Sequence, residues 1–91
     1  MKRDLSDLKK EVEDILFDAV FSPILFDQAL EALGTRYRQI LLMRYEQGLS
    51  LAEIAHHEDV SRQRIQQLIT YSKRLIAEYI EDVDASVEEY Q

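Results

Sequence analysis

Residues 48–75, GLSLAEIAHHEDVSRQRIQQLITYSKRL, constrain the fold of this chain more than any other stretch, because they predict two helices joined by a tight turn. Ser50 and Glu53 form a potential capping box, in which each side chain accepts a hydrogen bond from the backbone N–H of the other residue. The first helix is therefore expected to begin at Leu51. It buries one apolar face, on which the small Ala55 allows a second helix to cross closely.

The second helix of the pair is expected to be longer and to begin after Ser61, whose hydroxyl suits the N-cap position. Its apolar side chains lie at helical spacing and form one buried face: Ile65, Leu68, Ile69, Leu75 and Ile76. The opposite face carries hydrogen-bond donors: Gln63, Gln67, Thr70 and Arg74, with Gln66 on its flank and Arg62 near the N-terminus. This arrangement is typical of a helix-turn-helix, whose second helix enters the major groove of double-stranded DNA.

The donor-lined face admits two interpretations. Glutamine can make a bidentate contact with adenine, and arginine can do the same with guanine, so the face suits base edges. A polar face turned toward solvent is also a common property of amphipathic helices. The capping box, the short turn and the small Ala55 favour the DNA-binding interpretation.

The rest of the chain also predicts helices, so the expected fold is all-α, with about five helices in one small domain. Three helices are expected before the pair, over residues 4–20, 23–33 and 36–47. The predicted segments are residues 1–33, N-terminal helices for packing or partner binding; residues 34–77, the helix-turn-helix part; and residues 78–91, an acidic extension.

Local residue chemistry sets the expected helix ends. Ser22 suits an N-cap, with Pro23 at the first helical position. Gly34 is the expected residue just past the end of that helix, Thr35 caps the next one, and Gly48 closes it. The last helix either continues to the end of the chain, following the apolar spacing of Ile76, Ile80, Val83, Val87 and Tyr90, or frays after Asp84.

The first predicted helix carries an apolar seam that has two possible uses. Leu5, Leu8, Val12, Ile15 and Ala19 are three and four residues apart, so they share one side. The seam either folds back onto its own domain or binds a partner or a second copy, which leaves a monomer and a dimer both open. Phe17 and Phe21, on the other side, favour a partner surface. The candidate partner-binding residues are Leu5, Leu8, Val12, Ile15, Phe17 and Phe21.

The formal charge of −7 is unevenly distributed. Residues 1–34 carry 4 basic and 8 acidic side chains, residues 35–76 carry 7 and 4, and residues 77–91 carry none and 6. The basic middle coincides with the predicted helix pair and the helix before it, where it can neutralise phosphates. The acidic ends lower non-specific attraction to DNA, so we expect weak DNA binding by the chain alone.

Several classes of function receive no support from the residues. The chain has no cysteine, and His56 and His57 are adjacent and so lie on different helix faces; no metal site and no cofactor are expected. Ser50, His57 and Asp59 lack any pocket or oxyanion loop, so no catalytic residue and no enzyme is predicted. No apolar run has membrane-spanning length and no signal peptide is apparent, so a cytoplasmic protein without a membrane partner is expected.

Three runs of residues, in order, resemble region four of bacterial sigma factors of the housekeeping type, the domain that recognises the promoter element at minus thirty-five. They are L-x-x-R-x-R-x-I-L-x-M-R-Y at residues 33–45, G-L-S-L-x-E-I-A at residues 48–55 and V-S-R-x-R-I-x-Q at residues 60–67. The resemblance covers residues 30–76, about half of the chain. It implies a DNA-binding helix-turn-helix.

The resemblance also implies roles for single residues. It implies that Arg62 and Gln67 read bases and that Arg64 and its basic neighbours approach the DNA backbone. The candidate DNA-binding residues are Ser61, Arg62, Gln63, Arg64, Gln66, Gln67, Thr70 and Arg74.

The chain departs from the family pattern at three positions. Gln63 stands where the family usually has a base-reading glutamate, and Gln66 stands where an arginine is common, so promoter preference and affinity are expected to differ. Glu58 replaces an aromatic residue that usually packs at the turn, so we expect a looser turn.

Two functions follow as hypotheses. The first is a DNA-binding transcription regulator that acts with RNA polymerase at minus-thirty-five-type elements, beside a second sigma-like subunit that supplies the missing region-two domain. The second is an interaction module that binds RNA polymerase, a sigma factor or an anti-sigma partner without reading DNA; the resemblance supports it, because region four also docks on the polymerase β-subunit flap. A narrower resemblance, to small sigma-like proteins associated with signal-recognition-particle genes, also stays open.

Overall fold

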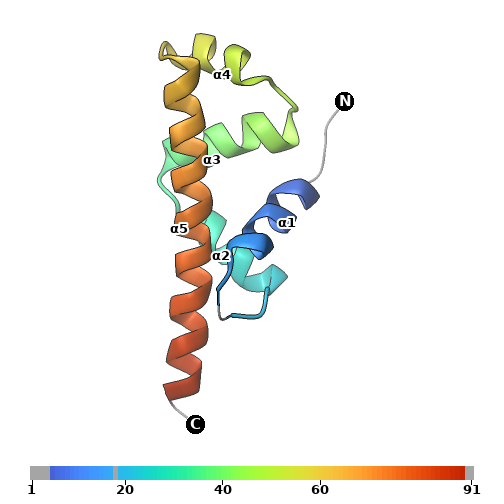
Figure 1. Ribbon diagram of the computed structural model, residues 1–91, viewed down its shortest axis with the longest axis vertical. Coiled ribbons are helices and arrows are strands. Elements are labelled where there is room, and N and C mark those ends of the chain that lie inside the picture. Colours follow the sequence, from blue (N-terminus) through green and yellow to red (C-terminus); the bar gives the residue numbers. More distant parts are fainter. Residues whose placement is uncertain (1–4, 18, 90–91) are drawn as a thin grey trace.

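The chain folds into helices connected by short loops (Figure 1), in a computed structural model that describes residues 5–17 and 19–89, with side chains up to residue 83. Its elements are α1 (Ser6–Ile15), α2 (Pro23–Ala32), α3 (Thr35–Leu41), the π-helical turn η1 (Leu42–Glu46), α4 (Leu51–Glu58) and α5 (Arg62–Glu89). The predicted all-α fold of five helices is confirmed. None of these helices combines the length and apolar character needed to cross a bilayer.

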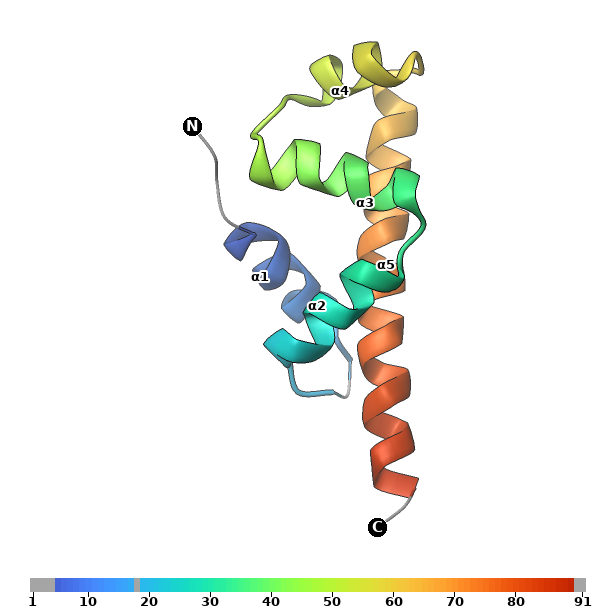
Figure 2. The same ribbon diagram turned by 180° about the vertical axis from the view of Figure 1, so that it is seen from behind.

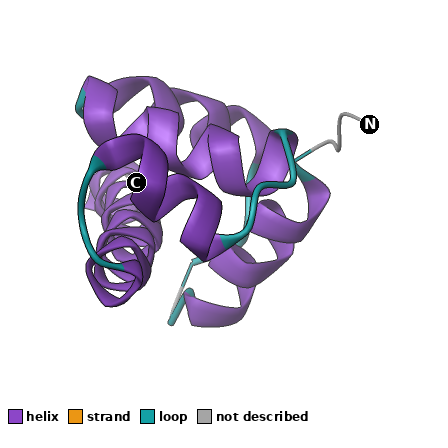
Figure 3. Cartoon of the chain, turned by 90° about the horizontal axis from the view of Figure 1, so that it is seen from above, coloured by secondary structure: helices purple, strands orange, loops and turns teal. Residues whose placement is uncertain are grey.

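The long helix α5 organises the molecule. It contains 28 residues, and α1, α2, α3 and α4 all pack against it. At 1.5 Å per residue it is about 42 Å long, close to the 48 Å long dimension of the whole molecule. Figure 2 shows α4 and α3 beside its N-terminal half and α1 and α2 further along, and Figure 3 shows the shorter helices gathered on one side of it.

A single hydrophobic core joins all five helices. Its fully buried large side chains are Leu8 and Val12 of α1, Phe26 of α2, Ile40 and Leu41 of α3, Ile54 of α4, and Ile65, Ile76 and Ile80 of α5. Residues on both sides of the two predicted segment boundaries, 33 and 77, contribute to this one core. The functional division into three segments stays a prediction.

Helix α1 is shorter than the predicted helix over residues 4–20. Asp4 and Asp18 lie outside the described residues, but α1 ends at Ile15 and Leu16 is already extended, with ψ 131°. Two contacts favour this early end. Leu16 and Ala19 pack against the core from the loop, and the backbone N–H of Phe17 donates a hydrogen bond to Oε1 of Glu81 on α5, at 2.7 Å.

The structure corrects the predicted partner surface on this helix. Leu8 and Val12 have no exposed area, so they belong to the protein's own core and offer nothing to a partner. Leu5 is partly buried against the same core. Phe21 is partly buried as well, with its ring centroid 5.9 Å from that of Phe26, so it does not form an exposed pair with Phe17.

The two glycines end helices in different ways. Gly48 has a φ of 74°, a left-handed conformation that suits its predicted place after the third helix. The prediction for Gly34 is wrong: it has φ −58° and ψ 149° and is the N-cap of α3, while Thr35 is the first residue of that helix. The buried Leu33 already turns the chain by becoming extended, so no left-handed residue is needed.

Helix α5 continues well past the predicted helix pair. Ile76 and Ile80 are fully buried, as their spacing predicted, and the backbone stays helical through Glu89 rather than fraying after Asp84. Tyr90 lies outside the described residues. The segment beyond Ile76 is therefore a structural part of the fold, at least up to Ile80.

Polar contacts tie α1 to the remaining fold. Oε1 of Glu11 lies 3.3 Å from the ammonium of Lys73 on α5. Burial, together with a hydrogen bond to the Glu11 carboxylate, raises the pKa of Tyr45 on η1 far above its ordinary value. Glu11 thus links α1 to both η1 and α5.

The burial of Ile80 gives a direct test of the long helix as part of the core. Ile80→Ala is expected to lower the free energy of unfolding by about 2 to 5 kcal/mol, because it leaves a cavity in the core. The matched variant Ile24→Ala removes the same atoms from a side chain that is 69% exposed, and should cost little. Urea denaturation followed by circular dichroism measures both. Equal, small losses would contradict a core that reaches this far along α5.

Candidate nucleic-acid interface

Side-chain caps fix the start of both helices in the helix-turn-helix. Ser50 and Glu53 form the predicted capping box: the hydroxyl accepts the N–H of Glu53 at 3.0 Å, and the carboxylate accepts the N–H of Ser50, also at 3.0 Å. The hydrogen bond from the Ser50 backbone N–H, together with one from the Ser50 hydroxyl, lowers the pKa of the exposed Glu53 carboxyl. The hydroxyl of Ser61 accepts the N–H of Arg64 at 3.0 Å, as expected for the N-cap of α5. Both helix starts were predicted correctly.

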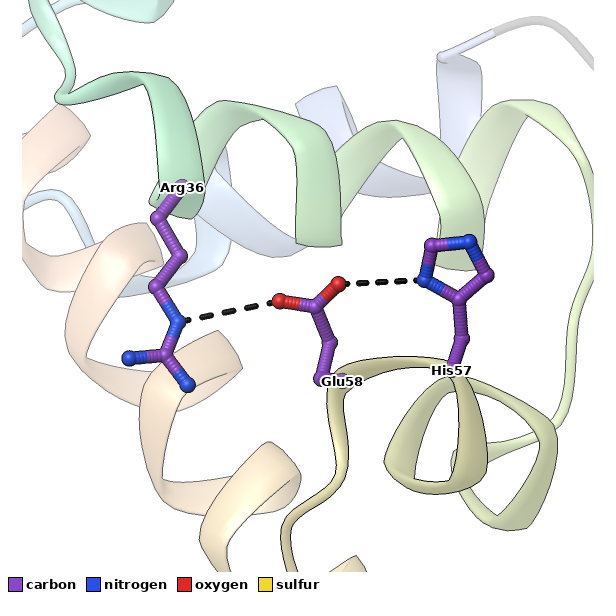
Figure 4. Close-up of polar contacts among 3 residues, drawn as sticks. All are labelled: Arg36, His57 and Glu58. Atoms are coloured by element: carbon purple, nitrogen blue, oxygen red, sulfur yellow. Dashed lines mark hydrogen bonds and ion pairs between the residues drawn. The ribbon is translucent and has the colours of Figure 1, made fainter.

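The turn between α4 and α5 is held by contacts at its first residues. Asp59 adopts the left-handed conformation, with φ 57° and ψ 45°, and ends α4. Glu58 has one carboxylate oxygen 3.7 Å from Nε of Arg36 on α3 and the other 3.2 Å from Nδ1 of His57 (Figure 4). Val60 packs against the core. The expected looser turn is not observed, because Glu58 replaces aromatic packing with polar contacts that include α3.

Buried apolar side chains set the orientation of α5 against α4. Ile54 and Ala55 are buried on α4, and Ile65, Leu68 and Ile69 are buried on α5. With this face of α5 turned inward, the residues on the opposite side must point away from the protein. The core therefore determines which side chains a ligand can reach.

The predicted DNA-binding residues are all exposed, and most of them gather in one place. Gln63, Gln66, Gln67, Thr70 and Arg74 line one open concavity of about 550 Å³ on the outer face of α5. We call these five residues, with Tyr71, the recognition face. Ser61, Arg62 and Arg64 are also exposed but do not line the concavity. They lie at the N-terminal end of the helix.

The arginines of α5 differ from the other arginines of the basic middle. The guanidinium groups of Arg62, Arg64 and Arg74 make no ion pair or hydrogen bond within the part of the chain that the structure describes. The others have partners: Arg36 lies near Glu58, Arg38 pairs with Glu31, and Arg44 donates to the carbonyl of Leu49 at 2.9 Å. Three free cations therefore remain where a phosphate backbone could be contacted.

Tyr71 is a member of the recognition face that the sequence did not suggest. It lines the concavity and is 49% exposed. Its ring lies 5.7 Å from that of Tyr37 on α3, which supports it from behind. Its position four residues after Gln67 and its phenolic O–H donor were the available signals. Ser72 was also missed: it is fully buried, and its hydroxyl donates to the carbonyl of Leu68 at 2.7 Å.

The residues considered for other chemistry are not brought together. The Ser50 hydroxyl is engaged in the capping box, and Nδ1 of the exposed His57 faces Glu58 rather than Asp59. Among residues 5–17 and 19–89, no three histidine, cysteine or acidic side chains form a group that could hold a metal ion.

Comparison with known families agrees with this geometry. Residues 29–74, half of the chain, match the family model described as Sigma-70, region 4. The chain belongs to this family. Its helix-turn-helix is therefore a DNA-binding module of a transcription-related class, as predicted.

Two curated relatives match a larger part of the chain. Both are named UPF0122 protein and come from strains of Clostridium kluyveri, and each is 41% identical over 56 residues. The match covers 62% of this chain, and the chain spans about half the length of these relatives. No solved structure matches the chain.

The capping box predicts a specific dependence of stability on pH. Since the pKa of Glu53 is lower in the folded protein than its ordinary value of 4.5, the charged carboxylate stabilises the fold above about pH 4.5. This contribution is lost as the pH falls through the folded pKa. Glu53→Gln keeps the capping geometry but removes the charge, so its deficit in melting temperature at neutral pH should disappear in acid.

Circular dichroism melts across this pH range measure the effect. Glu13→Gln, which removes an exposed carboxyl from α1, serves as the matched control. Ser50→Ala, which removes the hydroxyl cap itself, should cost about 1 kcal/mol at any pH. A Glu53→Gln deficit that stays constant into acid would show that the charge of Glu53 has no part in the cap.

Proposed function

We propose that this chain is a DNA-binding transcription regulator that acts with RNA polymerase at minus-thirty-five-type promoter elements. The observation that carries the proposal is the recognition face, a concave surface of exposed amide, hydroxyl and guanidinium groups on the second helix of a sigma-70 region 4 domain. The family supports a cytoplasmic location. As a further partner we propose a second sigma-like subunit that supplies promoter contacts outside this helix.

The side chains divide between base contacts and backbone contacts. Arg62 and Gln67 are the proposed base readers, since arginine pairs with guanine O6 and N7 and glutamine with adenine N6 and N7. Gln63 joins them on the same surface, but an amide both donates and accepts, so it favours adenine over the cytosine that a carboxylate would select. Arg64 and Arg74 are the proposed phosphate contacts.

The local charge supports weak but real attraction to DNA. Residues 60–74 contain four basic side chains, Arg62, Arg64, Lys73 and Arg74, and no acidic one. Lys73 is paired with Glu11, which leaves three free cations. So few phosphate contacts suit a protein that recognises DNA within a larger assembly.

Loss of the two base readers should weaken specific binding. The double variant Arg62→Ala plus Gln67→Ala is expected to lose at least the 1 to 3 kcal/mol typical of one bidentate contact, or about 5-fold to 150-fold in affinity. Fluorescence anisotropy on oligonucleotides selected from a promoter library measures it. The matched control is Lys10→Ala plus Gln28→Ala, which removes one cation and one amide from exposed positions on α1 and α2. Equal affinity of both double variants would contradict the proposal.

Arg64 provides a separate test of the backbone contact. Arg64→Ala should weaken binding to all sequences by a similar factor and reduce the slope of log affinity against log salt by about 1. Selectivity among sequences should stay as in the parent protein. A change in sequence preference without a change in slope would place Arg64 among the base readers instead.

An interaction module that never reads DNA is the second candidate. The acidic composition of both ends favours it, since residues 77–91 carry six acidic side chains and no basic one. Co-purification of RNA polymerase that survives the Arg62 and Gln67 substitutions, together with no salt-dependent DNA binding, would select this function over the first.

A further inference from the structure

Tyr71 is the aromatic residue of the recognition face, and the division into base readers and arginine contacts leaves it without a role. Its side chain is 49% exposed and lines the concavity. Its hydroxyl makes no hydrogen bond to any residue that the structure describes. The phenol is both a hydrogen-bond donor and an acceptor, on a ring that the fold holds in place. A ligand bound at the recognition face can therefore reach a free donor here.

Tyr71 lies at the margin of the recognition face, where the exposed side of α5 meets the buried side. Each residue turns a helix by about 100°, so Tyr71 lies about 40° around the axis from Gln67. It lies about 60° in the opposite direction from Leu68, which is buried. The Tyr71 side chain thus stands beside the base-reading surface and not at its centre.

Helix α3 lies against this margin. It packs on α5 (Figure 2), and the ring centroid of Tyr37 on α3 is 5.7 Å from that of Tyr71, with the ring planes tilted by 59°. The major groove is about 12 Å wide, and a helix with its side chains is about 10 to 12 Å across, so the groove has room for α5 alone. With α3 outside the groove, a side chain that contacts α3 faces the groove wall, which is the sugar-phosphate backbone.

The position of Tyr71 along α5 agrees with a backbone contact. The N-terminal residues of a recognition helix contact the base edges. Tyr71 comes eight residues after Gln63, which places it about 12 Å further along the axis. Arg74, a proposed phosphate contact, follows three residues later, and residues at this spacing are neighbours on a helix surface. Tyr71 and Arg74 can therefore contact the same stretch of backbone.

We propose that the Tyr71 hydroxyl donates a hydrogen bond to a phosphate of the DNA backbone, and that Tyr37 is a positioning residue that holds the Tyr71 ring. The inference rests on the proposed DNA-binding function and adds a contact to it. Tyrosine is among the side chains that bind phosphate oxygens, and such contacts fix the register of a protein on the duplex without reading sequence.

Duplexes that carry one methylphosphonate linkage each test this contact. Such a linkage replaces a charged phosphate oxygen with a methyl group. The duplex is an oligonucleotide selected from a promoter library with the parent protein, and the linkage is moved along both strands. Fluorescence anisotropy gives the affinity of the parent and of Tyr71→Phe for each duplex. A double-mutant cycle between protein and DNA then identifies the phosphate that the hydroxyl contacts.

Tyr71→Phe keeps the ring and removes only the hydroxyl. It should lower the affinity for the unmodified duplex by about 3-fold to 10-fold, as expected for one hydrogen bond. The factor should be the same for selected and scrambled sequences, and the salt dependence should be unchanged because no cation is lost. At one methylphosphonate position the loss should disappear. Tyr79→Phe, which removes a hydroxyl from α5 outside the concavity, should leave the affinity unchanged.

Tyr37 requires a separate comparison, because its side chain is partly buried against the core. Tyr37→Phe keeps the supporting ring and should bind DNA as the parent does. Tyr37→Leu should lower the affinity of the parent but not that of Tyr71→Phe, since the hydroxyl that it positions is then already absent. Equal losses in both backgrounds would show that Tyr37 acts through the fold alone and would overturn its positioning role.

Three outcomes would overturn the phosphate contact. One is equal affinity of Tyr71→Phe and the parent for the unmodified duplex; if Arg62→Ala plus Gln67→Ala still weakens binding, the proposed function stands without this contact. Another is a loss that occurs on the selected sequence and not on the scrambled one, which would assign Tyr71 to a base. The third is absence of DNA binding by the parent protein, which would overturn the proposed function and this contact together.

Discussion

The buried face of α5 is the constraint on which the rest of the structure depends. Every other helix packs against it, and the same helix carries the recognition face on its opposite side. Rotation of α5 by one residue corresponds to about 100° around its axis. Such a rotation would bury an exposed amide of the recognition face and expose a core isoleucine. Core packing and the presentation of Gln63 and Gln67 are therefore set by one and the same contact surface.

This dependence gives the N-terminal helices a role in the helix-turn-helix itself. Leu8 and Val12 of α1 contribute to the core that α5 shares, and Glu11 connects to Lys73. Lys73 lies next to Arg74 of the recognition face. The α1 helix thus supports the middle of α5 from the inner side. The segment that first suggested a partner surface stabilises the orientation of the recognition helix.

Sequence predicted the parts of the fold that depend on local chemistry. The caps at Ser50 and Ser61 and the inward face containing Ile65 and Ile76 were correct because a cap and a helical period involve neighbouring residues only. The errors at α1 and at its expected partner surface concern contacts between distant residues, whereas the error at Gly34 is local. Helix α1 ends early because its following loop bonds to Glu81, 64 residues away.

The candidate site shows the same limit. Its donors could be predicted from one helical wheel, since they lie on a single helix. The place of Tyr71 in the recognition face could not be predicted, because its ring packs against the ring of Tyr37 on another helix. The polar contacts of Glu58 at the turn could not be predicted either. Their cation is Arg36, which is distant in the sequence and lies close to Glu58 only after folding.

The negative net charge and the DNA-binding proposal are compatible because the charges are separated along α5. Gln63 and Glu81 are 18 residues apart on this helix, which corresponds to about 27 Å. That distance is about three Debye lengths at physiological salt, so Glu81 hardly weakens contacts made at Gln63. Glu78 lies one helical turn from Arg74, so the acidic half weakens contacts only at the C-terminal end of the recognition face. At low salt the screening length grows, and the acidic half then opposes approach to DNA from a distance.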